Sequence, residues 1–288
     1  MATKYHVRSN SFPSESHPSS TRIEQELTKI KTWEATSTSV SITTGLSYLE
    51  DLYISLEDLL RIASTQKTIS HHQGEKLVEE LLDGSVKILD ICGITRDTML
   101  QIKENVQSLH SSLRRRKGDS NIEKSVAEYN FFTKKMKKNV TKLITSLKQM
   151  ESKFGASSLL NQDQEVVAVI RVLREVIVMN ISIFRSILSF LVGSASKSKA
   201  AKWLKVAKMM HKKVVCEEKF ENSNELQCVE ASLSALLREG SNVSKMQDAH
   251  EKIEALENAI EMIENGLESV FRHLVKTRVS LLNIMTQS

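Results

Sequence analysis

The chain has 288 residues, with 40 Lys and Arg against 35 Asp and Glu, so its formal net charge is +5. It contains 2 prolines and 9 glycines, and no proline follows Pro18. A large sheet protein needs more of these turn residues, and the composition also excludes collagen-like and disulfide-scaffold proteins. The sequence therefore predicts an all-α protein, an elongated bundle of long antiparallel helices.

The cysteines bear on the compartment. Cys92, Cys216 and Cys228 are an odd number without close spacing, and no apolar secretory segment follows Met1. Both observations favour a reducing compartment over a disulfide framework. We expect a cytoplasmic protein that is not secreted, with peripheral attachment to membranes as an open alternative.

Residues 1–20 are rich in serine, contain both prolines and hold one acid, Glu15. Such a segment offers little to offset the entropy of ordering its backbone, so we predict a disordered tail. An organellar transit peptide is the alternative. Lys4 and Arg8 are its only basic residues, which disfavours that alternative.

The tail also contains a short motif, Arg8 to Pro13 (RSNSFP), similar to the R-S-x-S-x-P sequence that 14-3-3 proteins bind. A phosphate on Ser11 would offer a dianion to an arginine cluster, and Pro13 would turn the chain out of the binding groove. The pattern predicts a phospho-motif of Arg8, Ser11 and Pro13. Chance occurrence in a serine-rich tail is the alternative.

The first helix is predicted to begin at Thr21, because Glu24 three residues later is typical of a capping box. Apolar residues at helical spacing then predict a helix over residues 45–63. We expect a loop at residues 65–74.

Residues 76–115 carry a 3-4 repeat of mostly apolar side chains, which predicts one long helix. Gly84 and Gly93 lie inside it. Glycine costs up to about 1 kcal/mol relative to alanine within a helix. We therefore expect close helix approach or a local bend at both positions.

A break at residues 118–120 precedes a helix that ends near Phe154, and the most apolar helix follows at residues 163–192. Its stretch from Val176 to Val192 is shorter than the roughly 20 residues of a membrane span. Arg185 lies near the middle of that stretch, where it would cost about 2.5–3.5 kcal/mol on insertion. We predict a buried bundle helix in which Arg185 snorkels to solvent or meets an acid.

A linker at residues 193–199 is followed by helices predicted at about 200–219, 224–239 and 243–286. The last has a heptad repeat, which predicts a seam inside the bundle, with a homotypic coiled coil as the alternative. Its a positions are 253, 260, 267, 274 and 281, and its d positions are 256, 263, 270, 277 and 284. We expect residues 21–288 to form a single helical-bundle domain.

Charge is unevenly distributed. Residues 112–153 carry 12 Lys and Arg against 4 acids (12 − 4 = +8), and residues 197–213 carry 7 lysines and no acid. Residues 217–268 carry 13 acids against 4 Lys and Arg (4 − 13 = −9). The densest basic runs are Arg114, Arg115, Arg116 and Lys117, and Lys134, Lys135, Lys137 and Lys138.

This basic patch has three interpretations. A solvated face matched by the acidic segment is the simplest. Attachment to anionic lipid would contribute about 1 kcal/mol per basic residue near the surface. Nucleic-acid binding or nuclear import is the third, but no DNA-reading helix, zinc spacing or aromatic platform supports it.

The sequence contains no Gly-rich phosphate loop, HExxH or CxxC. The histidines lack partners at ligand spacing, and methionine pairs such as Met209-Met210 fit core packing better than a cofactor site. We therefore predict no catalytic, cofactor-binding or metal-binding residues, and enzyme is the weaker class.

Four stretches together resemble one plant family. They are Tyr5–Pro18, Leu81–Asp97, Leu109–Arg116 and Gly266–Ile284, in the family's order along the chain. The family has domains of unknown function and is related to the BYPASS proteins of root and shoot development. In the last stretch, His273 and Val275 stand where the family pattern has a basic residue and an isoleucine.

The resemblance implies an all-helical plant protein without known catalytic residues, involved in root and shoot development. We expect a non-enzymatic regulatory protein that acts through protein contacts of a helical bundle and a phosphorylatable tail, with 14-3-3 proteins as candidate partners. The alternative is a peripheral membrane or trafficking adaptor that binds anionic lipid. The sequence leaves the oligomeric state open.

Overall fold

Apolar residues recur every three or four positions after Pro18 without a proline to interrupt them, and the chain folds into helices accordingly. In the computed structural model, the described residues are 18–33, 36, 38–71, 76–115, 119–155, 164–193, 224–239 and 243–286. No strand occurs among them. The helices are α1 (Pro18–Thr32), α2 (Ser39–Leu60), α3 (Ala63–His71), α4 (Lys76–Arg114), α5 (Asp119–Gly155), α6 (Gln164–Val192), α8 (Glu225–Glu239) and α9 (Val243–Thr286).

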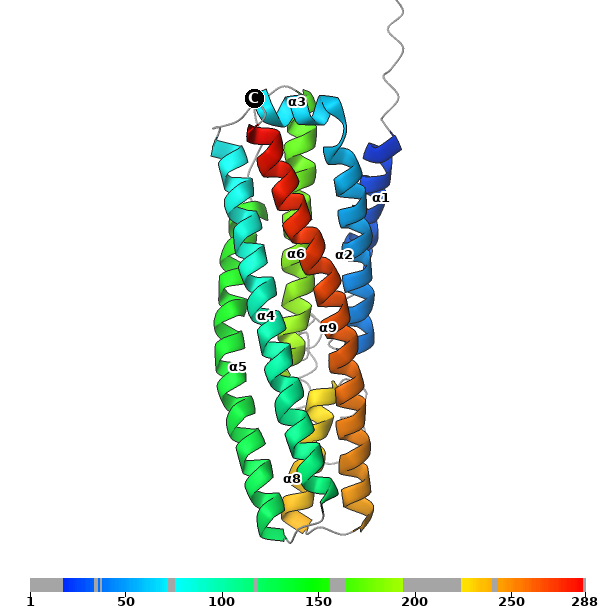
Figure 1. The fold of residues 1–288 in the computed structure, drawn as a ribbon, viewed down its shortest axis with the longest axis vertical. Helices are drawn as coiled ribbons and strands as arrows, with labels where there is room; N and C mark the ends of the chain where they lie inside the picture. Colours follow the sequence, from blue (N-terminus) through cyan, green and yellow to red (C-terminus); the bar gives the residue numbers. More distant parts are fainter. Residues whose placement is uncertain are drawn as a thin grey trace, which may run out of the picture.

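The predicted all-α class and the elongated antiparallel arrangement are confirmed (Figure 1). Helices α4, α5, α6 and α9 run along the long axis, and the short α3 crosses the end of the bundle near the C-terminus (Figure 1). The buried apolar side chains of all eight of these helices belong to one core cluster. The helix predicted at about 200–219 and the linker residues 194–199 lie outside the described residues.

Three predicted boundaries are wrong. The helix expected over residues 45–63 is α2, which begins at Ser39 and ends at Leu60. Helix α1 begins at Pro18, so Thr21 lies inside it and the last three residues of the predicted tail are helical. Proline suits the first turn of a helix, where its missing N–H would have no partner anyway. The loop expected at residues 65–74 is largely α3, because Thr65 and Ile69 are buried against neighbouring helices.

The apolar α6 lies in the interior of the bundle, in contact with α1, α2, α3, α4 and α5. Ala168–Val192 is the one helical stretch in the described ranges that is long and apolar enough to cross a membrane. Of its most apolar part, 61% is buried inside the protein. Arg185 pairs with Glu151 of α5, as predicted. The buried Asn180 donates to the Tyr53 hydroxyl at 2.8 Å and to the Val176 carbonyl at 2.8 Å.

Glycines allow close packing at two helix crossings. A Cβ at Gly84 of α4 would lie 2.6 Å from Cζ of Phe154 and 2.9 Å from Cδ1 of Ile177. A Cβ at Gly266 of α9 would lie 2.8 Å from Cδ1 of Leu46. The expected close approach is therefore present at Gly84 and absent at Gly93, where a Cβ would meet nothing within 4 Å.

Helix α9 packs against α2, α4 and α8. All ten predicted heptad positions are among its buried residues, so the repeat forms a seam within the chain. A ladder of polar side-chain pairs follows the antiparallel contact between α4 and α9. Its members are Arg96 with Glu268, Lys103 with Glu264 at 2.6 Å, and His110 with Glu257 at 3.1 Å.

The end of α6 and the start of α8 are joined to each other. Gly193 follows α6 with φ +71°, a left-handed conformation that suits glycine after a helix. The Asn224 side-chain amide donates to the Phe190 carbonyl at 2.8 Å, and Gln227 donates to the Gly193 carbonyl. These bonds hold the two ends of the segment 194–223 together.

Candidate interaction surfaces

The predicted phospho-motif of Arg8, Ser11 and Pro13 lies outside the described residues. The described chain begins at Pro18, the first residue of α1.

The predicted basic patch divides into two parts. Arg114 and Arg115 are exposed at the end of α4, and Arg116 and Lys117 lie outside the described residues. Lys134, the first residue of the second run, lies 15 residues beyond Asp119, the start of α5. At 1.5 Å per residue, this places it about 22 Å along that helix. The two runs therefore do not form one site.

The second run is itself divided by the helical period. Lys134, Lys135 and Lys138 are exposed on the outer side of α5. Lys137 instead points to α8, where its Nζ lies 2.6 Å from Oε1 of Glu230. Consecutive residues on a helix point about 100° apart, so neighbouring lysines have different surroundings.

Two further residues of the same face were not among the predicted site residues. Phe131 is 74% exposed, three residues before Lys134, and Lys142 continues the exposed row one turn beyond Lys138. Positions 131, 134, 135, 138 and 142 follow the i, i+3, i+4, i+7, i+11 pattern of one helix face. That spacing was visible in the sequence, but the exposure of Phe131 was not.

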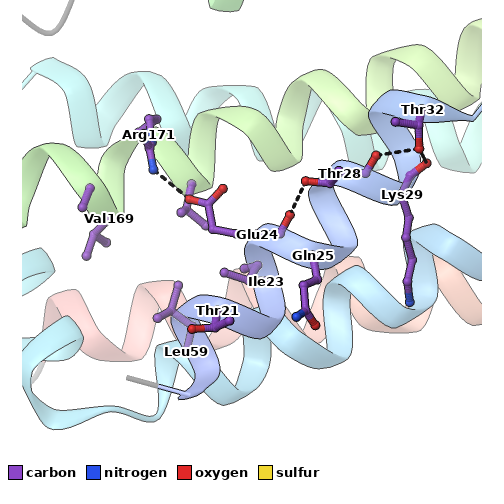
Figure 2. A pocket seen from close by; sticks show the side chains of 12 residues that line it. Thr21, Ile23, Glu24, Gln25, Thr28, Lys29, Thr32, Leu59, Val169 and Arg171 are labelled. Carbon is purple, nitrogen blue, oxygen red and sulfur yellow. Dashed lines mark hydrogen bonds and ion pairs between the residues drawn. The ribbon is translucent and has the colours of Figure 1, made fainter. Parts of the chain in front are cut away.

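A second surface feature is a groove of about 820 Å³ between α1 and α6, floored by Leu59 of α2 (Figure 2). Arg171 of α6 reaches across to Glu24 of α1 at 2.7 Å, and Lys31 pairs with Glu175 at 2.7 Å nearby. The lining residues are Thr21, Ile23, Glu24, Gln25, Thr28, Lys29, Thr32, Leu59, Ala168, Val169, Arg171 and Val172.

The threonines make the α1 wall of this groove less polar than its sequence implies. The Thr28 hydroxyl donates to the Glu24 carbonyl at 2.7 Å, and the Thr32 hydroxyl donates to the Thr28 carbonyl at 2.9 Å (Figure 2). Hydroxyls satisfied by the preceding turn need no partner in the groove. The groove therefore suits an apolar or amphipathic segment with a few charges at its edge.

The titratable groups of the core have structural partners. Glu57 of α2 contacts His273 at 2.9 Å and Lys276 of α9. Burial alone raises the pKa of Glu57, but the hydrogen bonds from Lys276 and His273 outweigh it, so the pKa lies below its ordinary value of 4.5. Glu57 is therefore an ionised link between α2 and α9.

The buried hydroxyl and thiol groups are held in their neutral forms. Burial raises the pKa of the Cys92 thiol to about 12, and it raises the pKa values of Tyr53 and Tyr129. A protonated thiol is a poor nucleophile. Within the described ranges, no group of three or more His, Cys, Asp or Glu residues could hold a metal ion.

The family model described as Protein BPS1 matches residues 45–284. This range runs from α2 to the last turn of α9 and contains the α5 face, while α1 lies before it. No curated protein matches the chain, and no solved structure matches it. Because the match covers more than half of the sequence, the chain belongs to the BPS1 family, the BYPASS-related plant family that it resembles.

Proposed function

We propose that this protein fulfils the regulatory role in plant development that membership of the BPS1 family implies. It does so without catalysis, by binding partner proteins through its helical bundle and its phosphorylatable tail. The observation that carries the proposal is the apolar groove between α1 and α6, next to the point where the tail enters the bundle.

The lining of the groove supports a peptide partner. Ile23, Val169 and Val172 offer apolar contacts, and the pair of Glu24 and Arg171 offers charges of both signs at the rim. An amphipathic helix laid along a groove uses this combination of contacts.

The tail adds a means of regulation. Ser11 lies seven residues before Pro18 (18 − 11 = 7). Seven extended residues span at most about 25 Å, so a 14-3-3 protein bound to phosphorylated Ser11 would lie near α1. Phosphorylation would then change access to the groove by adding a bulky neighbour.

The tail is tested with the full chain, phosphorylated by a plant kinase extract and titrated with a 14-3-3 protein in a calorimeter. We expect binding that disappears in a Ser11→Ala variant and after phosphatase treatment. Ser16→Ala is the matched control, because it removes a serine of the same tail that lies outside the motif. Equal binding by the Ser11→Ala protein would refute the phospho-motif.

The groove is tested by filling it. Ala168 is an exposed lining residue, so Ala168→Arg introduces a long charged side chain with little expected effect on the core. The control is Ala255→Arg, at an exposed position on α9. In plant tissue, we expect the Ala168→Arg variant to lose the cross-link between the groove and a partner segment, and the Ala255→Arg variant to retain that cross-link. Identical cross-links from both variants would contradict a groove partner.

A further inference from the structure

The outer face of α5 is a second surface, independent of the groove. Helix α5 packs against α6 and α4 through Tyr129, Met136, Val140, Leu147 and other buried residues. The opposite side of the helix is exposed from Phe131 onward. On that side, no acid of the described helices forms an ion pair with Lys134, Lys135, Lys138 or Lys142.

This face carries charge of one sign. Helix α5 has no Asp or Glu between Glu128 and Glu151, and Glu151 pairs with Arg185 of α6. Glu128 bounds the face at its N-terminal end. Between these two acids, Lys137 is the one lysine paired with a described acid, Glu230 of α8, and the rest of the charge is directed outward.

An apolar group lies beside the charges. Phe131 is 74% exposed and begins the row that continues with Lys134, Lys135, Lys138 and Lys142. Exposing an aromatic ring to water is unfavourable, whereas rings and lysine stems are both accommodated at the boundary between lipid headgroups and acyl chains. Position 142 lies eleven residues beyond position 131, about 16 Å along the helix, so the row would lie along a surface.

We propose that the outer face of α5 docks onto an anionic lipid bilayer. The occupant follows from the charges: α5 contains lysines and no arginine, and lysine is a point charge without the planar fork that pairs with individual phosphates or carboxylates. A row of point charges suits the diffuse negative potential of a bilayer, where each contributes independently. This proposal goes beyond the groove and the phospho-motif, and it stands if either of them fails.

The test uses flotation of the full chain with vesicles of phosphatidylcholine alone or mixed with phosphatidylserine. We expect salt-sensitive binding to the mixed vesicles only. The variant Lys134→Gln/Lys138→Gln/Lys142→Gln should lower the partition coefficient on the order of 100-fold. The control Lys67→Gln/Lys76→Gln/Lys87→Gln removes the same charge from exposed lysines of α3 and α4 and should lower it much less.

Phe131→Ala separates docking from simple charge attraction. It leaves every charge in place, and we expect it to lower binding about tenfold because the ring no longer enters the headgroup layer. Circular dichroism verifies that each variant is folded. Absence of binding to anionic vesicles overturns the proposal, as does an equal loss in both lysine triples. Binding of an acidic protein that depends on the α5 lysines, with vesicle binding unaffected by them, also overturns it.

Discussion

Helices α5 and α9 are both long and amphipathic, but their charges have different surroundings. The charges of α9 that flank its seam meet partners on α4 and α2, as in the pairs Glu264 with Lys103 and Lys276 with Glu57. On α5, Lys137 meets Glu230, while the exposed row from Lys134 to Lys142 faces outward. Charges beside a seam help to set the register of two helices, whereas charges opposite a seam remain exposed to solvent.

The largest expected difference between the two helices concerns the core. Ile263 of α9 is 0% exposed, so Ile263→Ala should lower the free energy of unfolding by about 2–5 kcal/mol. Phe131→Ala on α5 removes a larger side chain, but because that side chain is exposed, the free energy of unfolding should change by less than about 0.5 kcal/mol. Urea unfolding followed by circular dichroism measures both. Similar losses would mean that Phe131 is covered in solution.

A smaller effect is expected at the link between α2 and α9. Glu57→Gln should lower the free energy of unfolding by about 1–2 kcal/mol at neutral pH, because a charged acceptor for Lys276 and His273 is lost. The pKa of Glu57 is lowered in the folded state, so its contribution is complete above its ordinary pKa of 4.5 and declines as the pH falls below it.

The wild-type protein should therefore lose more stability than the Glu57→Gln variant when urea unfolding is repeated at successively lower pH values below 4.5. Glu254→Gln, at an exposed position of α9, is the matched control and should keep the wild-type pH dependence. Parallel pH profiles for wild type and Glu57→Gln would show that Glu57 does not hold the two helices together.

The smallest expected effect separates two neighbouring lysines of α5. Lys137→Gln should cost about 0.2–1 kcal/mol, because it breaks a partly exposed ion pair with Glu230. Lys138→Gln should leave stability unchanged and lower vesicle binding instead. Thermal unfolding and flotation of the two variants compare these roles directly. If both substitutions changed the free energy of unfolding alike, the charges of α5 would be paired within the bundle as those of α9 are.

Much of the fold could be predicted because helix periodicity is local information. The heptad of α9 identified side chains that are all buried, from Ile253 to Ile284. The same reasoning failed at α3, whose polar sequence indicated a loop. There, tertiary burial of Ile69 outweighs weak local propensity.

The surfaces were harder to predict, because they depend on which helices become neighbours. The sequence located the lysine run of α5 but not the pairing of Lys137 with a residue of α8, 93 positions away. The groove depends on α1 and α6 lying side by side, with Arg171 reaching Glu24 across 147 positions. A periodic pattern describes one helix face at a time and does not specify the facing helix.

The bonds from Asn224 to the Phe190 carbonyl and from Gln227 to the Gly193 carbonyl bear on how far the chain between them can change in length. They hold Gly193 and Asn224, the two described residues that border the segment 194–223, at one place, so a change in the length of that segment adds little to the cost of bringing its ends together. Each doubling of a flexible loop adds only about 0.6 kcal/mol. Natural insertions, deletions or a grafted peptide between these two anchors should therefore leave the bundle intact, which makes this position a suitable site for diversification.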